Sequence, residues 1–290
     1  MTPHRSTRAA SADDLLARLG RLTAQAKEGA ELHQARVELA EALQREILPA
    51  SLPSVPGLRT AARYAPARHG LSVGGDWYDG FLLPEGALGF SIGDVEGHDV
   101  EAAAFMGQVR IAVRAVAAAA ADPGEVLSRA NDLLLSVDCD LFATCTFLCF
   151  DPVTWEICSA RAGHVPAVWA TQDGRYGVVE DEGGPPLGML PGATYPVTRR
   201  SLGKAGSFVL VTDGVVEGPS FPIEAGLARV ADVVRAAAGS DPGELAAEVM
   251  KVADSTGHAD DAAVLVLSHE AAPGRQDTSR GTGRADAAGP

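Results

Sequence analysis

Six aspartates lie at the ends of apolar, strand-like segments of the chain. They are Asp76 and Asp79 in VGGDWYD, Asp94 at the end of ALGFSIGD, Asp213 in SFVLVTDG, and Asp260 and Asp261 directly before AAVLVLS. A strand end places a carboxylate at the rim of its sheet, and a neighbouring glycine lets the backbone approach closely. Backbone carbonyl oxygens can then join the carboxylates around a common centre.

Several carboxylates that converge on one rim repel one another, and divalent cations relieve that repulsion. Ligation by oxygen alone suits magnesium or manganese better than zinc. An Asp-Gly pair after a strand is also a common turn, so each aspartate taken singly has a plain structural explanation. Sequence spacing does not show that the six side chains meet, because Asp76 and Asp260 are far apart in the chain. The residues predict a multi-carboxylate metal site only if the fold brings them together.

The composition bounds the class of protein. The chain has 290 residues, 46% of them hydrophobic, which is enough for one large domain with a sizeable core. Lys and Arg number 24 against 38 Asp and Glu, so the net charge is −14. A field of this sign repels nucleic acid and anionic lipid, which argues against a general binder of either. The sequence has no run of 18 apolar residues and no apolar signal core, and we expect a cytoplasmic protein.

The elements that must position the aspartates follow from the hydrophobic pattern. Short runs rich in Val, Leu and Phe predict strands at 87–95, 141–150, 165–170, 208–212 and 262–267. Short turns at 151–154 and 173–174 predict antiparallel neighbours. Helices are predicted at 100–120, from 122 to about 137 and from 241 to about 253, and the last two begin with the same N-capping sequence, Asp-Pro-Gly-Glu. Runs of strands with segregated helices predict an α+β layered domain.

The chain divides into four segments. Residues 1–12 and 270–290 have little to bury and are expected to be disordered, whereas 13–48 is predicted to be a helix and 58–268 the folded domain. The helix carries a heptad-like stripe of leucines that is interrupted near Gly29. Such a stripe can dock on its own domain or form a parallel coiled coil with a second copy, and the sequence leaves both open.

Seven motifs follow one another in the predicted domain. In order they are VGGDWYD, SIGDVEGHD, FATCTFLCFD, ARAGHVPAVW, GGPPLGML, LVTDGVVE and DDAAVLVL. This set resembles the SpoIIE/RsbU branch of the PPM-type (type 2C) metal-dependent serine/threonine protein phosphatases, over roughly residues 58–268. The resemblance implies a sandwich of two antiparallel β-sheets flanked by helices, preceded here by the N-terminal helix. It also implies a two-metal centre at one end of the sandwich.

The resemblance assigns roles to individual residues. It implies that two or three manganese or magnesium ions are bound by Asp76, Asp94, Asp213, Asp260 and the backbone carbonyl of Val95. Asp94 is expected to bridge two ions, and Asp79 and Asp261 are secondary candidates. The reaction implied is hydrolysis of phosphoserine or phosphothreonine by a metal-activated water, which needs no protein nucleophile.

Histidines and cysteines near the motifs allow other interpretations. His98, four residues after Asp94, could donate a proton to the leaving oxygen, although a surface turn is the simpler explanation for it. His164 is assigned mainly to shaping a loop. The cysteines, at positions 139, 145, 149 and 158, have no CxxC or zinc-site spacing and are expected to be buried. A cysteine-dependent phosphatase requires an arginine six residues after its cysteine, and His164 occupies that place after Cys158.

The resemblance also implies partners. Members of this branch commonly dephosphorylate a small anti-anti-sigma protein with a STAS domain, which then captures an anti-sigma factor. About fifty residues precede the match, too few for a sensor domain, so control is expected through the helix at 13–48, as a homodimer, or through a separate activator protein. Two other functions remain open on the residues: a catalytically silent docking module, and a two-metal phosphodiesterase, which the acidic charge disfavours.

Overall fold

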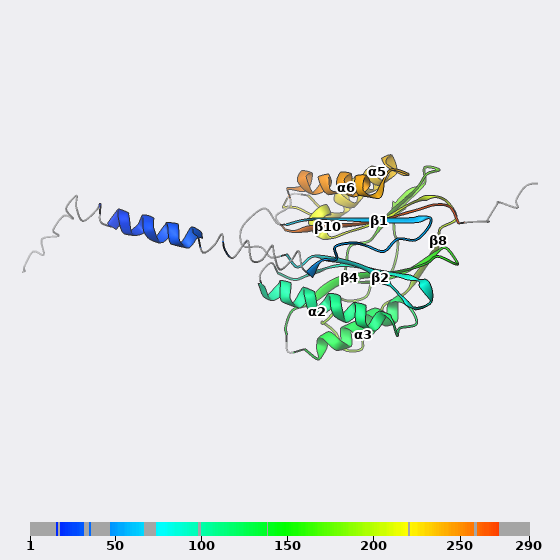
Figure 1. Cartoon of the computed structure of the whole chain (residues 1–290), viewed down its shortest axis with the longest axis horizontal. Coiled ribbons are helices and arrows are strands. Elements are labelled where there is room, and N and C mark those ends of the chain that lie inside the picture. The colour runs from blue at the N-terminus through cyan, green and yellow to red at the C-terminus, as the bar shows by residue number, and fades with distance from the viewer. Residues whose placement is uncertain are drawn as a thin grey trace, which may run out of the picture.

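The strands pair into two antiparallel sheets that pack face to face (Figure 1). The computed structural model describes residues 16, 18–31, 35, 47–66, 74–97, 100–137, 139–219, 221–257 and 260–272. The first sheet has the order β1 (Leu58–Ala65), β10 (Ala262–His269), β9 (Gly206–Val211), β6 (Val168–Thr171) and β7 (Tyr176–Val178). The second has the order β2 (Trp77–Leu82), β3 (Leu88–Val95), β4 (Ala143–Asp151), β5 (Glu156–Ala162) and β8 (Thr198–Ser201).

Helices cover the outer face of each sheet, so the domain has four layers (Figure 1). The first sheet is covered by α5 (Ile223–Ala236) and α6 (Pro242–Thr256), and the second by α2 (Val100–Ala117) and α3 (Pro123–Leu135). The one-turn helix α4 (Asp213–Val216) follows β9, and a short 3₁₀ turn, Pro84–Gly86, connects β2 to β3. The predicted sandwich of antiparallel sheets flanked by helices is confirmed.

Alternating side chains of the central strands fill two different layers of the core. In β10, Ala263, Leu265 and Leu267 face the second sheet, while Val264 and Val266 pack under α5 and α6. All eight residues of this strand are buried. A strand that is apolar on both faces reads as a continuous apolar run, which is the pattern of AAVLVLS.

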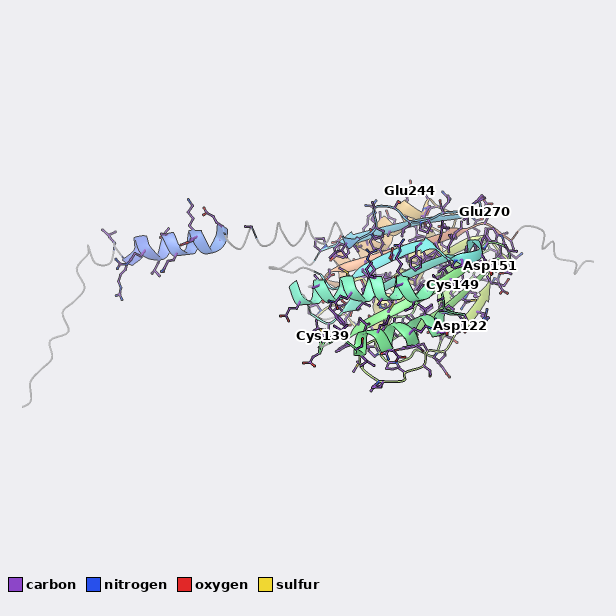
Figure 2. The ribbon with its side chains drawn as sticks, turned by 60° about the horizontal axis from the view of Figure 1, so that its bottom comes forward. Asp122, Cys139, Cys149, Asp151, Glu244 and Glu270 are labelled. Atoms are coloured by element: carbon purple, nitrogen blue, oxygen red, sulfur yellow. The ribbon has the colours of Figure 1, made fainter. Side chains whose placement is uncertain are left out.

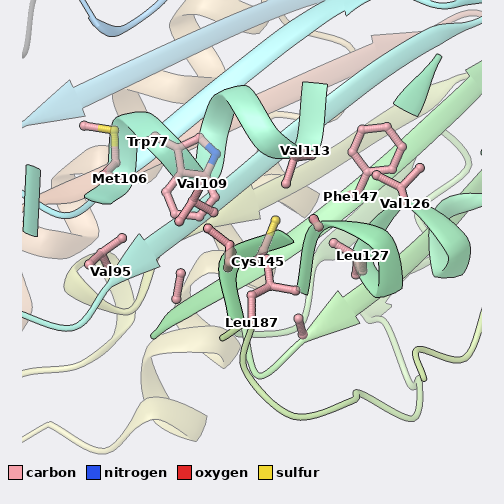
Figure 3. Close-up of a cluster of buried hydrophobic side chains, with 14 of the residues drawn as sticks. Trp77, Val95, Met106, Val109, Val113, Val126, Leu127, Cys145, Phe147 and Leu187 are labelled. Carbon is pink, nitrogen blue, oxygen red and sulfur yellow. The ribbon is translucent and has the colours of Figure 1, made fainter. Parts of the chain in front are cut away.

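A third apolar layer lies between the second sheet and its helices (Figure 3). From α2, Met106, Val109 and Val113 point toward the sheet, where they meet Trp77 and Phe147 (Figure 3). Their spacing of three and four residues places them on one side of the helix, as the sequence predicts. This packing fixes α2 directly after the turn that follows β3.

The two predicted N-caps are present. The Asp122 carboxylate accepts from Glu125 N at 2.9 Å, and Asp241 accepts from Gly243 N at 2.8 Å. Helix α5 lies outside the predicted set, although its buried residues follow the helical spacing from Leu227 to Val234. It begins after Pro222 without a side-chain cap, so the capping signal that marks the other two helices is missing.

About half of the predicted N-terminal helix, 13–48, lies within the described residues. Residues 18–31 are helical, and Leu16, Leu19 and Leu22 of the leucine stripe are 65%, 61% and 62% exposed. Near its predicted end, Ile47 and Leu48 pack against the apolar layer under α2.

Residues 1–15 and 273–290 are outside the described part. Of the tail predicted to be disordered from 270, Glu270 and Ala272 donate backbone hydrogen bonds to Gly57 and Leu202, so the prediction does not hold for 270–272. Among the helices described, none combines the length and the apolar character needed to cross a membrane.

Asp79 ties β2 to α2 rather than lying free at the sheet rim. Its carboxylate is fully buried and accepts from Arg110 Nη1 at 3.0 Å and from Arg114 Nη1 at 3.1 Å. The Arg114 guanidinium also lies over the Phe81 ring, 4.8 Å from its centroid. Both carboxylate oxygens therefore have cationic partners, which corrects the expectation that Asp79 is a secondary metal ligand.

We expect the substitution Asp79→Asn to destabilise the domain by about 3 kcal/mol, because it leaves two guanidinium groups without their buried partner. Because Arg114 is partly exposed, the expected loss of stability is at the lower end of the range for buried ion pairs. Urea unfolding measures the change in the free energy of unfolding. Glu248→Gln, which removes the exposed ion pair with Lys251, serves as the control and should change stability by less than about 0.5 kcal/mol. Equal effects of the two substitutions would contradict the assigned role.

Candidate metal centre

Three aspartates from different elements meet at one end of the sandwich. Asp76 precedes β2, Asp94 lies at the end of β3, and Asp213 opens α4 directly after β9. One carboxylate oxygen of each lies within 4.8 Å of those of the other two. Asp76 is 1% exposed, and the other two are partly buried. The fold thus brings together three of the four carboxylates predicted as principal ligands.

A glycine brings a backbone carbonyl to the same place. Val95 N donates to Gly75 O at 3.2 Å, which pairs the two backbone segments beside the cluster. A Cβ atom at Gly75 would lie 2.3 Å from Val95 O and 2.9 Å from Asp94 Oδ1. Only glycine allows this approach. The Val95 carbonyl, predicted as a backbone ligand, therefore lies at the edge of the carboxylate cluster.

Thr212 orients Asp76. Its hydroxyl donates to Asp76 Oδ2 at 2.7 Å and accepts from Ala263 N at 2.8 Å. Because the hydroxyl is buried and held by the backbone of β10, it fixes the carboxylate without competing for the second oxygen.

The two adjacent aspartates before β10 differ in their surroundings. Asp261 is 2% exposed, and its Oδ2 accepts from Asp76 N at 2.9 Å and from Tyr64 Oη at 2.8 Å. Asp260 is exposed, and its Oδ1 accepts from Asp261 N at 2.9 Å. Asp261 thus holds the backbone of Asp76, whereas Asp260 remains open to solvent. Asp260 is not part of the close group of three, but its charge is near enough to raise the pKa of both Asp94 and Asp213.

Burial and mutual repulsion make these carboxylates hard to ionise together. Burial, followed by the charges of Asp261, Asp94 and Asp213, raises the pKa of Asp76 well above its usual range. Burial and the charge of Asp213 raise the pKa of Asp94 to about 8. Burial and the hydrogen bond with Asp260 raise the pKa of Asp261 to about 7. The site favours any ligand that adds positive charge.

His164 is buried in a loop beside the strand pair that carries Asp94. It is 3% exposed, and its Nδ1 lies 2.9 Å from the hydroxyl of Thr144, the residue opposite Asp94 in the β3–β4 register. Burial, with a contribution from Arg161, lowers the pKa of His164 to about 3, so the ring is neutral. The histidine supports the strand pair that carries Asp94.

His98, a secondary candidate that could donate a proton but for which a surface turn is the simpler explanation, lies outside the described residues. Two residues that the sequence analysis does not identify contribute to the site, Thr212 and Tyr64. Thr212 is next to Asp213 in the motif LVTDGVVE, so its place before a strand-end aspartate was a usable signal. Tyr64 gives no such signal, because only the β1–β10 pairing brings it to Asp261.

The donor set fits a hard divalent cation. It consists of carboxylate and carbonyl oxygens held by backbone and hydroxyl contacts, with no sulfur or imidazole among the three clustered ligands. Such sets bind magnesium or manganese. The raised pKa values show that the carboxylates are short of positive charge, which is the condition a cation corrects.

The chain is similar to known protein sequences over most of the domain. The sequence model of the family described as Stage II sporulation protein E (SpoIIE) matches residues 84–270. Protein IcfG of Synechocystis is 28% identical over 65% of this chain and 34% of its own length. Phosphoserine phosphatase RsbU of Bacillus subtilis is 25% identical over 63% of this chain and 54% of its own length. The chain thus spans about a third and about half of these relatives.

Solved structures share the fold. The structure of the RsbU and RsbW domains of Rv1364c from Mycobacterium tuberculosis has a TM-score of 0.70 and 33% identity, covering 78% of this chain and 64% of that one. The catalytic domain of the serine/threonine protein phosphatase PstP, in complex with two manganese ions, has a TM-score of 0.57 and 15% identity, covering 74% of this chain and 99% of that one. The second likeness shows the fold alone.

The clustered carboxylates predict how metal-free stability depends on pH. Because their pKa values are raised in the folded state, the folded protein holds protons that the unfolded chain releases. The contribution of these carboxylates to stability is therefore fully present below about pH 4. It is lost as the pH rises toward 8. In chelator, we expect the melting temperature to fall by about 5–10 °C between pH 5 and pH 8. Added manganese should reverse the fall at pH 8.

Two variants separate the cluster from general charge effects. Asp94→Asn should flatten the pH dependence, whereas Asp232→Asn makes the same charge change at an exposed site on α5 and should not. A metal-free melting temperature with the same pH dependence in all three proteins would contradict the electrostatic account.

Proposed function

The chain belongs to the SpoIIE family, and we propose that it is a metal-dependent protein serine/threonine phosphatase. The observation that carries the proposal is the group of Asp76, Asp94 and Asp213, whose oxygens converge within 4.8 Å at the open end of a phosphatase-type sandwich. Support also comes from RsbU, a relative whose name is that of a phosphoserine phosphatase. Two or three manganese or magnesium ions are the proposed cofactors.

We assign Asp76, Asp94, Asp213, Asp260 and the Val95 carbonyl as ligands. Asp94 is the proposed bridging ligand, as the resemblance to the family implies. It shares the cluster with Asp76 and Asp213; burial and the charge of Asp213 raise its pKa, whereas its hydrogen bond with Asp76 lowers it. Asp261 and Thr212 act as positioning residues through Asp76. A pair of bound cations would acidify a water and neutralise the phosphoryl oxygens in the transition state.

Two groups near the cluster that could compete as nucleophiles, Cys145 and Thr212, are not free to react. Cys145, on the strand beside Asp94, is fully buried, and burial raises the pKa of its thiol. The Thr212 hydroxyl is already engaged on both sides. The role of this chain's residues is therefore to hold charge and to fix geometry, as expected for hydrolysis by water.

The proposed substrate is a phosphoserine or phosphothreonine on an anti-anti-sigma protein with a STAS domain. The basis is the motif set shared with the SpoIIE/RsbU branch, together with the neighbouring structure in which an RsbU domain and an RsbW domain belong to one chain. Dephosphorylation would let the STAS protein capture an anti-sigma factor. A reaction of this kind takes place in the cytoplasm, and the net charge of −14 does not favour nucleic acid or anionic membrane as partners.

Phosphate release from a phosphorylated STAS-domain protein of the same organism tests the proposal. We expect turnover that requires manganese or magnesium and stops in chelator. Asp94→Asn and Asp260→Asn should each lower kcat by about 10²–10³-fold, the usual cost of removing one group that stabilises transition-state charge. Asp232→Asn, the same change at an exposed site, should be without effect.

The outcomes separate the chemistry from the partner. Metal-dependent hydrolysis of an aryl phosphate without release from the STAS protein would keep the phosphatase and reject the substrate. Full activity of Asp260→Asn would remove Asp260 from the ligand set. Metal binding without turnover of either compound would favour a docking module, or a phosphatase that is inactive without a separate activator protein.

We also propose that the N-terminal helix forms a homodimer and influences α2. The exposed leucines at 16, 19 and 22 lack a covering surface in the described part of the chain. At the other end, Ile47 packs under α2, where a Cβ atom at Gly107 would lie 4.0 Å from it. Because α2 follows the turn after Asp94 and Val95, movement of the helix can reach the metal ligands.

A shortened protein that begins at Pro49 should be monomeric and several-fold less active than the full chain. The variant Leu19→Glu/Leu22→Glu should also be monomeric but retain the Ile47 contact, which separates dimerisation from packing under α2. Light scattering measures the mass and phosphate release the activity. A shortened protein that is monomeric and equally active would refute the linkage.

A further inference from the structure

Two half-buried cysteines face each other across neighbouring strands, away from the metal centre. Cys149 of β4 is directly opposite Cys158 of β5 in the antiparallel register, and both are free thiols. Directly opposed residues point to the same face of a sheet. The pair lies near the end of β4 opposite to Thr144, the residue beside Asp94. This corrects the expectation that the cysteines are simply buried: only Cys145 is buried, and Cys139 is exposed.

The register brings the two thiols close to bonding distance. Opposed residues in an antiparallel pair have Cβ atoms about 4.5–5.5 Å apart. A disulfide requires about 3.5–4.5 Å between the same atoms. A small approach of β4 and β5 is therefore enough to join them.

The thiols are accessible through a cavity of about 620 Å³ at this end of the second sheet. Both cysteines line it, together with Asp122, Glu125 and Arg199. Figure 2 shows Cys149 on the same side of the domain as Asp122 and Asp151 and well separated from Cys139. A small oxidant can enter this space, whereas Cys145 has no such access.

Arg199 distinguishes Cys158 from its partner. Its Nη1 donates to Cys158 Sγ at 3.1 Å. A guanidinium in this position stabilises the thiolate, which is the form that reacts with oxidants. Cys158 is therefore the sulfur that reacts first, with Cys149 beside it to complete the bond.

We propose that Cys149 and Cys158 form a reversible intramolecular disulfide when the protein meets a peroxide. The Cys158 thiol ionises, and its thiolate attacks one peroxide oxygen. The O–O bond breaks, the departing hydroxide takes up the proton that the thiol released, and the products are a sulfenic acid and one water. The Cys149 sulfur then attacks the Cys158 sulfur, and its thiol proton leaves with the departing hydroxide as a second water. Two thiols are oxidised and one hydrogen peroxide is reduced, and a thiol reductant restores the pair.

The environment sets the speed of this reaction. Burial raises the pKa of the Cys158 thiol. Burial, together with the neighbouring Cys158, raises the pKa of the Cys149 thiol to about 12. At neutral pH both are largely protonated, so oxidation is slower than at an exposed thiol and accelerates as the pH rises. The pair therefore responds to sustained oxidation.

The test treats the full-length protein with hydrogen peroxide, blocks remaining thiols with N-ethylmaleimide, and maps each cysteine by peptide mass spectrometry. We expect a peptide that joins Cys149 to Cys158, recovery of both thiols in dithiothreitol, and a higher melting temperature for the oxidised protein. Cys139 reports that the oxidant has acted, and Cys145 should remain reduced. The variant Cys139→Ser removes the exposed thiol and so prevents disulfides between two molecules.

Single variants locate the reaction. In Cys158→Ser, Cys149 should remain open to alkylation, and Arg199→Gln should slow disulfide formation several-fold without changing oxidation of Cys139. Cys149 and Cys158 that both stay alkylatable after prolonged peroxide treatment at raised pH, long after Cys139 is fully oxidised, would overturn the proposal. So would a joined peptide that contains Cys139 in place of either residue. Melting of each variant before oxidation confirms that it is folded.

Discussion

Repulsion between carboxylates at the open end of the sandwich is the constraint on which the site depends. Asp76, Asp94 and Asp213 are drawn within a few ångströms of one another in surroundings where water does little to screen them. The fold holds them there by rigid means: the close approach at Gly75, the hydroxyl of Thr212 and the backbone of β10. The repulsion between these charges offsets part of the folding free energy that the apolar layers contribute. Binding of a divalent cation would remove that repulsion.

The site belongs to both sheets. Asp94 comes from the second sheet, whereas Asp213 and Asp261 flank strands of the first. The distance between them is set by the apolar layer between the sheets, where side chains such as Phe90 and Leu265 are fully buried. Packing far from the cluster thereby determines whether its oxygens converge. The same logic applies to α2, whose position depends on Asp79 and on the apolar layer beneath it.

Local signals were enough to predict β3, β4, β6, β9 and β10, the helices α2, α3 and α6, and the aspartates at strand ends. They were not enough to separate the clustered carboxylates from the aspartates that support other parts of the fold. Asp79 and Asp261 look like Asp76 in the sequence, yet one is held by arginines and the other holds a backbone amide. Arg110 and Arg114 lie four residues apart and so share a helix face, a signal that becomes informative only once α2 is placed against β2. Likewise, no local pattern pairs Cys149 with Cys158, because pairing requires the register of the hairpin.

The pairing of β1 with β10 joins the two ends of the domain. Leu58 is opposite His269, so β10, the last described strand along the chain, joins the edge strand β1 to the rest of the first sheet. Contacts between such distant residues are slow to form, and they come late in folding. Asp260 and Asp261 directly precede this strand, and Thr212 is held by its backbone. The hydrogen bonds that orient Asp76 therefore form only when the domain closes, so a partly made or partly folded chain does not possess the complete carboxylate cluster.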